Sequence, residues 1–348
     1  MNKPALNIGL NHKPFIIAEM SGNHNQSLDR ALEIVESAAK AGADALKIQT
    51  YTADTLTLKA DTEDFFINDQ DSLWKGQSLH KLYQLAYTPW EWHKAIFDRC
   101  NQLGIIGFST PFDETAVDFL EKLDVPMYKI ASFENNHIPL LRKIAKTGKP
   151  IIMSTGMASI GELNDAVNAI REIGDNQITL LKCTSAYPAS PKDANLRTIP
   201  HMRELFGCEI GLSDHTTGIG VAVASVSFGA TVIEKHFTTS RADGGVDAAF
   251  SLEPAELQSL VTSTEQAWQA CGKVSYGTSA NEEGSMKFRR SMYISKDIKE
   301  GETFIYGKNI RIVRPGYGLQ PKEIDQFEGR KASRSAKAGT RVTWDLLG

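Results

Sequence analysis

The sequence predicts an α/β protein: a (β/α)8 (TIM) barrel followed by a small C-terminal module. Eight short apolar runs alternate with helix-like segments over roughly residues 15–240, which is the order of elements in such a barrel. An open doubly wound sheet is the alternative, but no GxGxxG dinucleotide fingerprint follows any run. The length of 348 residues also fits a barrel of about 250 residues with an appendage.

The eight expected strands are rich in Ile and Val and do not alternate strictly between apolar and polar residues. This pattern is typical of parallel strands that are buried on both faces. The expected strands cover residues 15–21, 45–50, 105–110, 127–132, 150–155, 178–184, 209–214 and 231–236.

Start and stop signals for helices separate these runs. Ser27 precedes an amphipathic segment that stops at Gly42, and Ser159 opens another with Glu162 three residues later. Both are typical N-terminal caps, and the glycine is a typical C-terminal stop. Residues 51–89 are longer than a usual connection between strand and helix, so we expect a lid or a subunit contact there.

The pattern of predicted elements changes after the barrel. Residues 254–271 predict one more helix, and residues 272–284 are rich in Gly, Ser and small polar residues, as in a linker. Short strand-like pieces with turns follow. We therefore predict a barrel domain over residues 1–283 and a small domain over residues 284–348, which is marginal alone and needs a surface to pack on.

Composition excludes several functional classes. There are 38 Lys and Arg against 42 Asp and Glu, a formal net charge of −4, so nothing indicates a nucleic-acid partner. No stretch approaches the roughly 18–20 apolar residues of a membrane span. The N-terminal residues lack the apolar core of a signal peptide, and we expect a cytoplasmic protein. The four cysteines show no CxxC spacing, which argues against a zinc knuckle.

Nearly every expected strand ends in polar residues, at the end of the barrel where chemistry takes place in this fold. A single buried polar residue is usually structural. Eight decorated strand ends together predict a polar pocket at the barrel mouth. Its candidates include Glu19, Lys47, Gln49, Thr110, Lys129, Ser132, Glu134, Ser154, Lys182, Ser185, Tyr187, Ser213, His215, Glu234 and His236.

The residue types in this pocket indicate two kinds of ligand. Lys47 and Lys129 among hydroxyl groups are typical of a phosphate site. His215 and His236 end neighbouring strands, about 4.8 Å apart, so their imidazoles can share one metal ion. With only two histidines, an open site suits Mn²⁺ or another divalent ion better than structural zinc. From the residues alone we expect a metal-assisted enzyme acting on a phosphorylated small molecule.

The chain resembles the sialic acid synthase family over essentially its whole length. The matching segments are IAEMSGNHNQSL, GADALKIQTY, FSTPFD, YKIASFENN, KPIIMSTGM, KCTSAYP, GLSDHT, GATVIEKHFT, SKDIKEGE and RPGYG. The C-terminal module resembles the antifreeze-like (SAF, β-clip) domain of these enzymes. The segments SFENNHIPLLRKIA and RRSMYISKDIK are most similar to the pseudaminic acid branch of the family.

The resemblance implies that phosphoenolpyruvate condenses with an N-acetylated amino sugar to give a nonulosonic acid and phosphate. In the pseudaminic branch the acceptor is 2,4-diacetamido-2,4,6-trideoxy-L-altropyranose. The sialic branch uses N-acetylmannosamine, and the legionaminic branch uses 2,4-diacetamido-2,4,6-trideoxymannose. The implied cofactor is a divalent metal ion, most often Mn²⁺, with Mg²⁺ or Co²⁺ as alternatives. The implied assembly is a domain-swapped homodimer.

The resemblance also implies roles for individual residues. His215 and His236 match the metal ligands, and Glu19 matches a catalytic carboxylate near the metal and the reacting sugar carbon. Ser185 stands where sialic acid synthases often have Asn. Arg314 matches an arginine that one subunit inserts into its partner's barrel. The implied phosphoenolpyruvate site is Lys47, Thr110, Lys129, Ser132, Ser154, Ser185 and Ser213. The implied sugar site is Gln49, Glu134, Tyr187, Asp247 and Arg314.

Two other functional classes stay open at this point. A Schiff-base aldolase would use Lys129 or Lys182 as its nucleophile and would need no metal. A sugar- or ice-binding protein is suggested by the antifreeze-like module, but that function leaves the polar barrel mouth unexplained.

Overall fold

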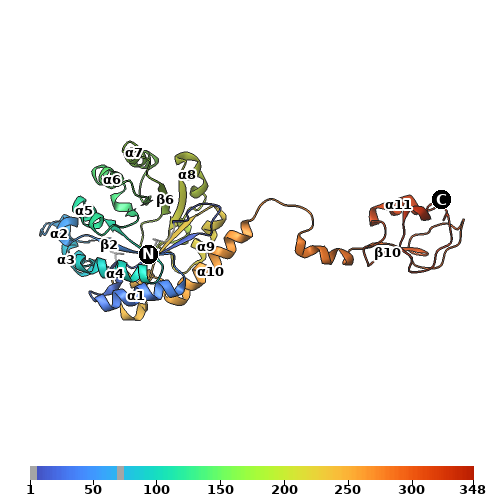
Figure 1. The fold of residues 1–348 in the computed structure, drawn as a ribbon, viewed down its shortest axis with the longest axis horizontal. Helices are drawn as coiled ribbons and strands as arrows, with labels where there is room; N and C mark the ends of the chain where they lie inside the picture. Colours follow the sequence, from blue (N-terminus) through green and yellow to red (C-terminus); the bar gives the residue numbers. More distant parts are fainter. Residues whose placement is uncertain (1–5, 69–73) are drawn as a thin grey trace. The chain divides into compact units, whose positions relative to one another are not determined.

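The computed structural model describes residues 6–68 and 74–348. Eight parallel strands form a closed barrel in the order in which they occur along the chain (Figure 1), which confirms the predicted fold. The strands lie within or at the edges of the expected runs. They are β1 (Phe15–Glu19), β2 (Ala45–Thr50), β3 (Ile106–Pro111), β4 (Tyr128–Ile130), β5 (Ile151–Ser154), β6 (Ile178–Cys183), β7 (Glu209–Ser213) and β8 (Val232–His236).

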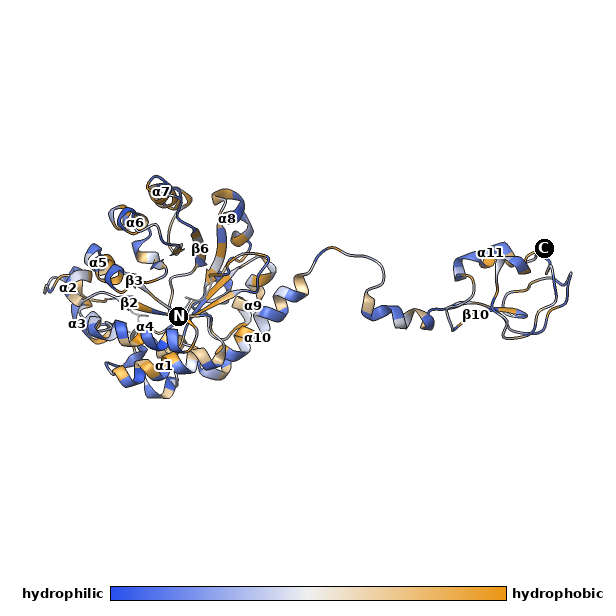
Figure 2. Ribbon diagram, in the orientation of Figure 1, coloured by the Kyte–Doolittle hydropathy of each residue, from blue (hydrophilic) through white to orange (hydrophobic). Residues whose placement is uncertain are grey.

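Helices surround the strands, as Figure 1 shows. Both colours of the hydropathy scale appear on these helices in Figure 2, as expected for helices with one buried face. The helices of this unit are α1 (Leu28–Ala41), α2 (Ala53–Leu56), α3 (Leu79–Ala86), α4 (His93–Gln102), α5 (Glu114–Lys122), α6 (Ile138–Ala145), α7 (Ile160–Arg171), α8 (Thr198–Phe206), α9 (Gly220–Ser227) and α10 (Pro254–Cys271).

The predicted helix caps are present. The Ser27 hydroxyl accepts a hydrogen bond from the Arg30 amide, and Gly42 ends α1 in the left-handed region at φ 93°. Ser159 and Glu162 form a capping box at the start of α7. The long connection over residues 51–89 contains α2 and α3. Residues 69–73, within the predicted lid or subunit contact, lie outside the described residues.

Alternating side chains along each strand produce two apolar layers. Ile16, Ala18, Leu46 and Ile48 pack outward against the helices in the larger cluster. Phe15, Ile17 and Ala45 belong to a second cluster, which fills the barrel interior together with Ile106, Phe108, Met127, Ile152, Leu181 and Val232. The next inward positions along the chain carry polar side chains, so a polar layer lies above the apolar core at the carboxyl ends of the strands.

The chain divides into two compact units, Met1–Gly272 and Lys273–Gly348. The second unit contains the antiparallel pair β9 (Ser291–Ile294) and β10 (Ile310–Val313), followed by α11 (Ile324–Phe327). It has its own core of buried residues that includes Phe304 and Phe327. The predicted domain limit at residue 283 stays a prediction. Within the described residues, no helix combines the length and apolarity that a membrane crossing needs.

Gly211 on β7 is a position where the barrel interior has no room for a side chain. A Cβ atom there would overlap the Val232 carbonyl oxygen and lie 2.6 Å from Leu181 Cδ2. We expect Gly211→Ala to lower the free energy of unfolding by about 1–3 kcal/mol, measured by urea denaturation. Gly161→Ala is the control, because its nearest atom would be Ser159 Oγ at 3.9 Å. Equal stability of both variants would contradict this packing.

Candidate active site

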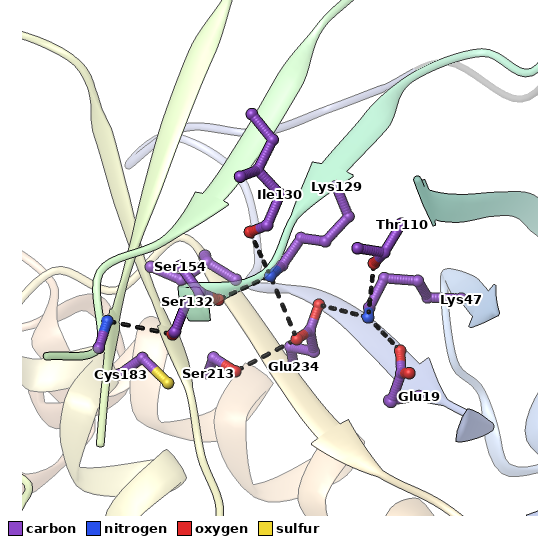
Figure 3. A network of polar contacts seen from close by, with 12 residues as sticks. Glu19, Lys47, Thr110, Lys129, Ile130, Ser132, Ser154, Cys183, Ser213 and Glu234 are labelled. Carbon is purple, nitrogen blue, oxygen red and sulfur yellow. Dashed lines mark hydrogen bonds and ion pairs between the residues drawn. The ribbon is translucent and has the colours of Figure 1, made fainter. Parts of the chain in front are cut away.

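The mouth of the barrel gathers several of the predicted site residues into one polar layer (Figure 3). Ion pairs and hydrogen bonds join side chains from β1, β2, β3, β4, β5, β7 and β8 there. This layer is almost sealed from solvent, since Lys47 is 4% exposed and Lys129 is 1% exposed. Its charged members are Glu19, Lys47, Lys129 and Glu234, whose formal charges cancel.

Lys47 is held by three strands other than its own. Its ammonium group forms an ion pair with Glu19 on β1. It also donates a hydrogen bond to Thr110 Oγ1 at 3.2 Å, and Glu234 Oε2 lies 3.9 Å away. Gln49, two residues further along β2, donates from Nε2 to Glu19 Oε1 at 3.1 Å. Four predicted site residues are therefore in direct contact.

Lys129 reaches the same layer from β4. Its Nζ donates to Ser154 Oγ at 2.6 Å and to the Ile130 carbonyl at 3.0 Å, and it lies 3.7 Å from Glu234 Oε1. The hydroxyl of Ser213 donates to the same carboxylate oxygen at 3.2 Å. These contacts bring two more predicted site residues, Ser154 and Ser213, beside the two lysines.

Burial and charge shift the pKa values of these buried groups in different directions. Burial raises the pKa of Glu19, which forms an ion pair with Lys47. Burial opposes ionisation of Glu234 too, but the charges of Lys129 and Lys47 outweigh it and lower the pKa. Burial lowers the pKa of Lys129. These shifts favour a charged Glu234 between the two lysines and make Glu19 the carboxylate that gains a proton more easily.

The segments that follow β4, β5 and β6 meet at Gly156, where two serine hydroxyls approach the backbone closely. The Gly156 amide donates to Ser132 Oγ at 3.1 Å. A Cβ atom at Gly156 would lie 2.7 Å from Ser132 Oγ and would overlap Ser185 Oγ. Asn135 Nδ2 fixes this segment by donating to the Gly156 carbonyl at 3.1 Å. Hydroxyl groups gathered in this way suit the oxygen atoms of a phosphate.

His215 and His236 lie side by side, with ring centroids 5.4 Å apart. His215 Nδ1 is 2.9 Å from the Thr184 carbonyl. A carbonyl only accepts, so Nδ1 carries the proton and Nε2 keeps its lone pair for a ligand. His236 Nδ1 is buried without a hydrogen-bond partner. The pair fits an open site for a divalent ion, although no group of three His, Cys, Asp or Glu side chains in the described ranges surrounds one point.

A buried ion pair outside the barrel supports the segment that carries His215. Lys235 Nζ donates to Asp214 Oδ2 at 3.0 Å and to the Gly218 carbonyl at 2.9 Å, and it also bonds the Thr216 carbonyl. Asp214 in turn accepts from the Thr216 amide at 2.9 Å. All three ammonium hydrogens of Lys235 therefore fix the chain next to His215.

The remaining predicted residues surround the histidines or lie apart from them. The Tyr187 ring centroid is 4.4 Å from that of His215, and Asp247 Oδ2 is 3.6 Å from His236 Nδ1. Glu134 lies in the segment after β4 and has a buried Oε2 without a hydrogen-bond partner. Arg314 belongs to the C-terminal unit, directly after β10.

Three residues of this site received no role from the sequence: Glu234, Gly156 and Phe250. Glu234 lies within 4 Å of both lysines, Gly156 lets two serine hydroxyls approach the backbone, and the Phe250 ring lies 4.9 Å from that of His236. Strand periodicity supports the place of Glu234 in the polar pocket, because it stands two positions before His236 and therefore faces the same side, but it does not show the contact with both lysines. Sequence patterns hold no comparable signal for Gly156 or Phe250.

Glu134 makes the stability of the protein depend on pH. Burial raises the pKa of its carboxyl from 4.5 to about 7. The folded state then binds this proton more tightly than the unfolded state, so stability falls as pH rises from about 4.5 to 7. Glu134→Gln should remove that decline, which is on the order of 2–3 kcal/mol, in urea denaturation at pH 5 and pH 8. Wild-type and variant curves that shift in parallel would contradict the expectation.

The chain is similar to known proteins in both sequence and fold. Residues 34–276 match the NeuB family, and residues 289–348 match the SAF domain. The pseudaminic acid synthase of Campylobacter jejuni is 44% identical to this chain over 96% of both chains. The N,N'-diacetyllegionaminic acid synthase of that species is 37% identical, over 93% of this chain and 97% of that protein. The crystal structure of N-acetylneuraminic acid synthetase from Leptospira borgpetersenii, in complex with citrate, is 32% identical, with a TM-score of 0.73 over 83% of this chain and 95% of that one. The chain belongs to the NeuB family and carries a C-terminal SAF domain.

Proposed function

We propose that the protein is a pseudaminic acid synthase. It condenses phosphoenolpyruvate with 2,4-diacetamido-2,4,6-trideoxy-L-altropyranose and water to give pseudaminic acid and inorganic phosphate. The observation that carries the proposal is the pair of buried lysines, Lys47 and Lys129, beside hydroxyl groups at the barrel mouth. The greater similarity to the Campylobacter pseudaminic acid synthase than to the legionaminic enzyme of that species supports the choice of acceptor.

The phosphate group binds at the β2–β5 side of the mouth. Lys47 and Lys129 offset its charge, and the hydroxyls of Thr110 and Ser154 already contact these two ammonium groups. The hydroxyls of Ser132 and Ser185, which meet at Gly156, offer further donors. Buried ammonium and hydroxyl groups that are already in place stabilise an anion more strongly than the same groups would in water.

The reaction joins two carbons and breaks one C–O bond. C3 of phosphoenolpyruvate attacks the aldehyde carbon of the open-chain acceptor, whose oxygen becomes a hydroxyl. Water adds at C2, and the bond from C2 to the bridging oxygen breaks, which releases inorganic phosphate. Glu19 positions or deprotonates this water, because its carboxylate gains a proton more easily than that of Glu234.

His215 and His236 would hold a divalent ion, for which Mn²⁺ is the first candidate and Mg²⁺ and Co²⁺ are alternatives. Such an ion makes an aldehyde carbon more electrophilic and helps to orient the two substrates. The carbonyl of Thr184 keeps Nδ1 of His215 protonated, and the ion pair of Lys235 with Asp214 fixes the neighbouring backbone.

The acceptor sugar binds toward the rim, where Gln49, Glu134, Tyr187 and Asp247 supply polar contacts. We include Arg314 in this part of the site, contributed by the SAF domain of a second subunit in a domain-swapped homodimer. An N-acetylneuraminate or legionaminate synthase is the alternative within the family. The Schiff-base aldolase has less support, because Nζ of Lys129 and of Lys182 is already engaged by backbone carbonyls at 3.0 Å.

Phosphate release with the three family acceptors tests the reaction directly. With phosphoenolpyruvate and Mn²⁺, we expect the L-altropyranose acceptor to give a kcat/KM at least about 10-fold above the values for N-acetylmannosamine and the trideoxymannose acceptor. The reason is that polar groups placed for the hydroxyls of one sugar stay unpaired when a different sugar binds. A higher value with either other sugar would move the enzyme to that branch. Absence of phosphate release with all three would contradict the proposed function.

Metal removal tests the histidine pair. Dialysis against EDTA should reduce activity to background, and added Mn²⁺ should restore it. His236→Ala should lose Mn²⁺ binding in calorimetry while its melting temperature stays close to that of the wild type. Full activity of the metal-free enzyme would rule out the metal role.

A further inference from the structure

Among the residues that the structure describes, Glu234 is the carboxylate within 4 Å of both buried lysines, and the proposed reaction assigns it no task. It projects from β8, which lies opposite β4 in the closed eight-stranded order. Its carboxylate lies 3.7 Å from Lys129 Nζ and 3.9 Å from Lys47 Nζ, as Figure 3 shows. Ser213 holds one oxygen, whereas Oε2 is buried without a hydrogen bond. One carboxylate therefore bridges lysines from two strands that are not neighbours.

The two lysines depend on this carboxylate to different degrees. Lys47 has a second counter-charge in Glu19. The hydrogen bonds of Lys129 go to a serine hydroxyl and a backbone carbonyl, both neutral. A buried charge without an opposite charge close by is costly. Without Glu234, Lys129 would therefore turn away or lose its proton. The site would then lose one of its two ammonium groups.

We propose that Glu234 is a positioning residue for the phosphoenolpyruvate anion. Before the substrate arrives, its carboxylate keeps the ammonium groups of Lys47 and Lys129 charged. It also fixes one of them on each side of the carboxylate. The substrate phosphate then enters a site whose cations are already in place, which reduces the cost of ordering them. This inference rests on the proposed function, since it names phosphoenolpyruvate as the anion.

The direction in which one substitution changes the affinity for the anion distinguishes a positioning role from mere proximity. If Glu234 were only a neighbouring negative charge, it would repel the substrate, and Glu234→Gln would tighten binding. If it holds the lysines, the same variant weakens binding although a repulsive charge has been removed. Gln has the shape of Glu, so the variant changes charge with little change in packing.

The experiment is calorimetric titration of full-length wild-type protein and variants with phosphoenolpyruvate, and in parallel with inorganic phosphate. We expect Glu234→Gln to raise the Kd for both anions by about 10-fold or more. Glu234→Asp keeps the charge and should bind more tightly than Glu234→Gln. Glu209→Gln is the matched control, because Glu209 is also a strand carboxylate in an ion pair, with Arg203. It should stay within about 2-fold of the wild type.

An unchanged or lower Kd in Glu234→Gln, with a wild-type melting temperature, would overturn the inference. A Glu234→Asp variant no better than Glu234→Gln would overturn it too, because charge would then not be the cause. Wild-type protein that binds phosphate but not phosphoenolpyruvate would contradict the proposed function, and the phosphate titrations would still decide the role of Glu234. Wild-type protein that binds neither anion would contradict both.

Discussion

Charge balance inside the barrel is the constraint on which the rest of the site depends. Two lysines and two glutamates lie in an interior where an unpaired charge is expensive. Their ion pairs run from Glu19 through Lys47 and Glu234 to Lys129. The formal charges of the layer cancel without a ligand. The ammonium groups of the two lysines, once held in place, can still receive an anion. Hydroxyl groups from β3, β5 and β7 complete this network.

The barrel provides this layer at little structural cost because side chains alternate along its strands. Positions that face inward begin with an apolar core around Phe15 and Phe108, and they end with the charged residues at the mouth. The opposite positions pack on the helices. One repeated pattern thus supplies a stable core, a helix-covered outer surface and a polar site. The connections that follow the strands add the serine hydroxyls at Gly156 and His215, which lies beside His236 at the end of β8.

Much of this could be predicted from the sequence, because it depends on local patterns. The strands, the caps at Ser27 and Ser159 and the gathering of polar strand ends follow from periodicity and end signals, and the family follows from motifs. What depends on distances could not be predicted. The bridging position of Glu234 needs strands from opposite sides of the barrel, and the gathering of two serine hydroxyls at Gly156 needs three connections to meet. The roles of individual residues stay predictions, including that of Arg314 from a second subunit.

The central claim is that the polar layer at the barrel mouth binds phosphoenolpyruvate through Lys47 and Lys129. A crystal structure of the protein with phosphoenolpyruvate tests this most directly. We expect the phosphate within hydrogen-bond distance of Lys129 Nζ and Lys47 Nζ, with oxygen atoms directed toward the hydroxyls of Ser132 and Ser185. Phosphoenolpyruvate bound at the amino-terminal end of the strands, or at the mouth without contact to either lysine, would contradict the claim.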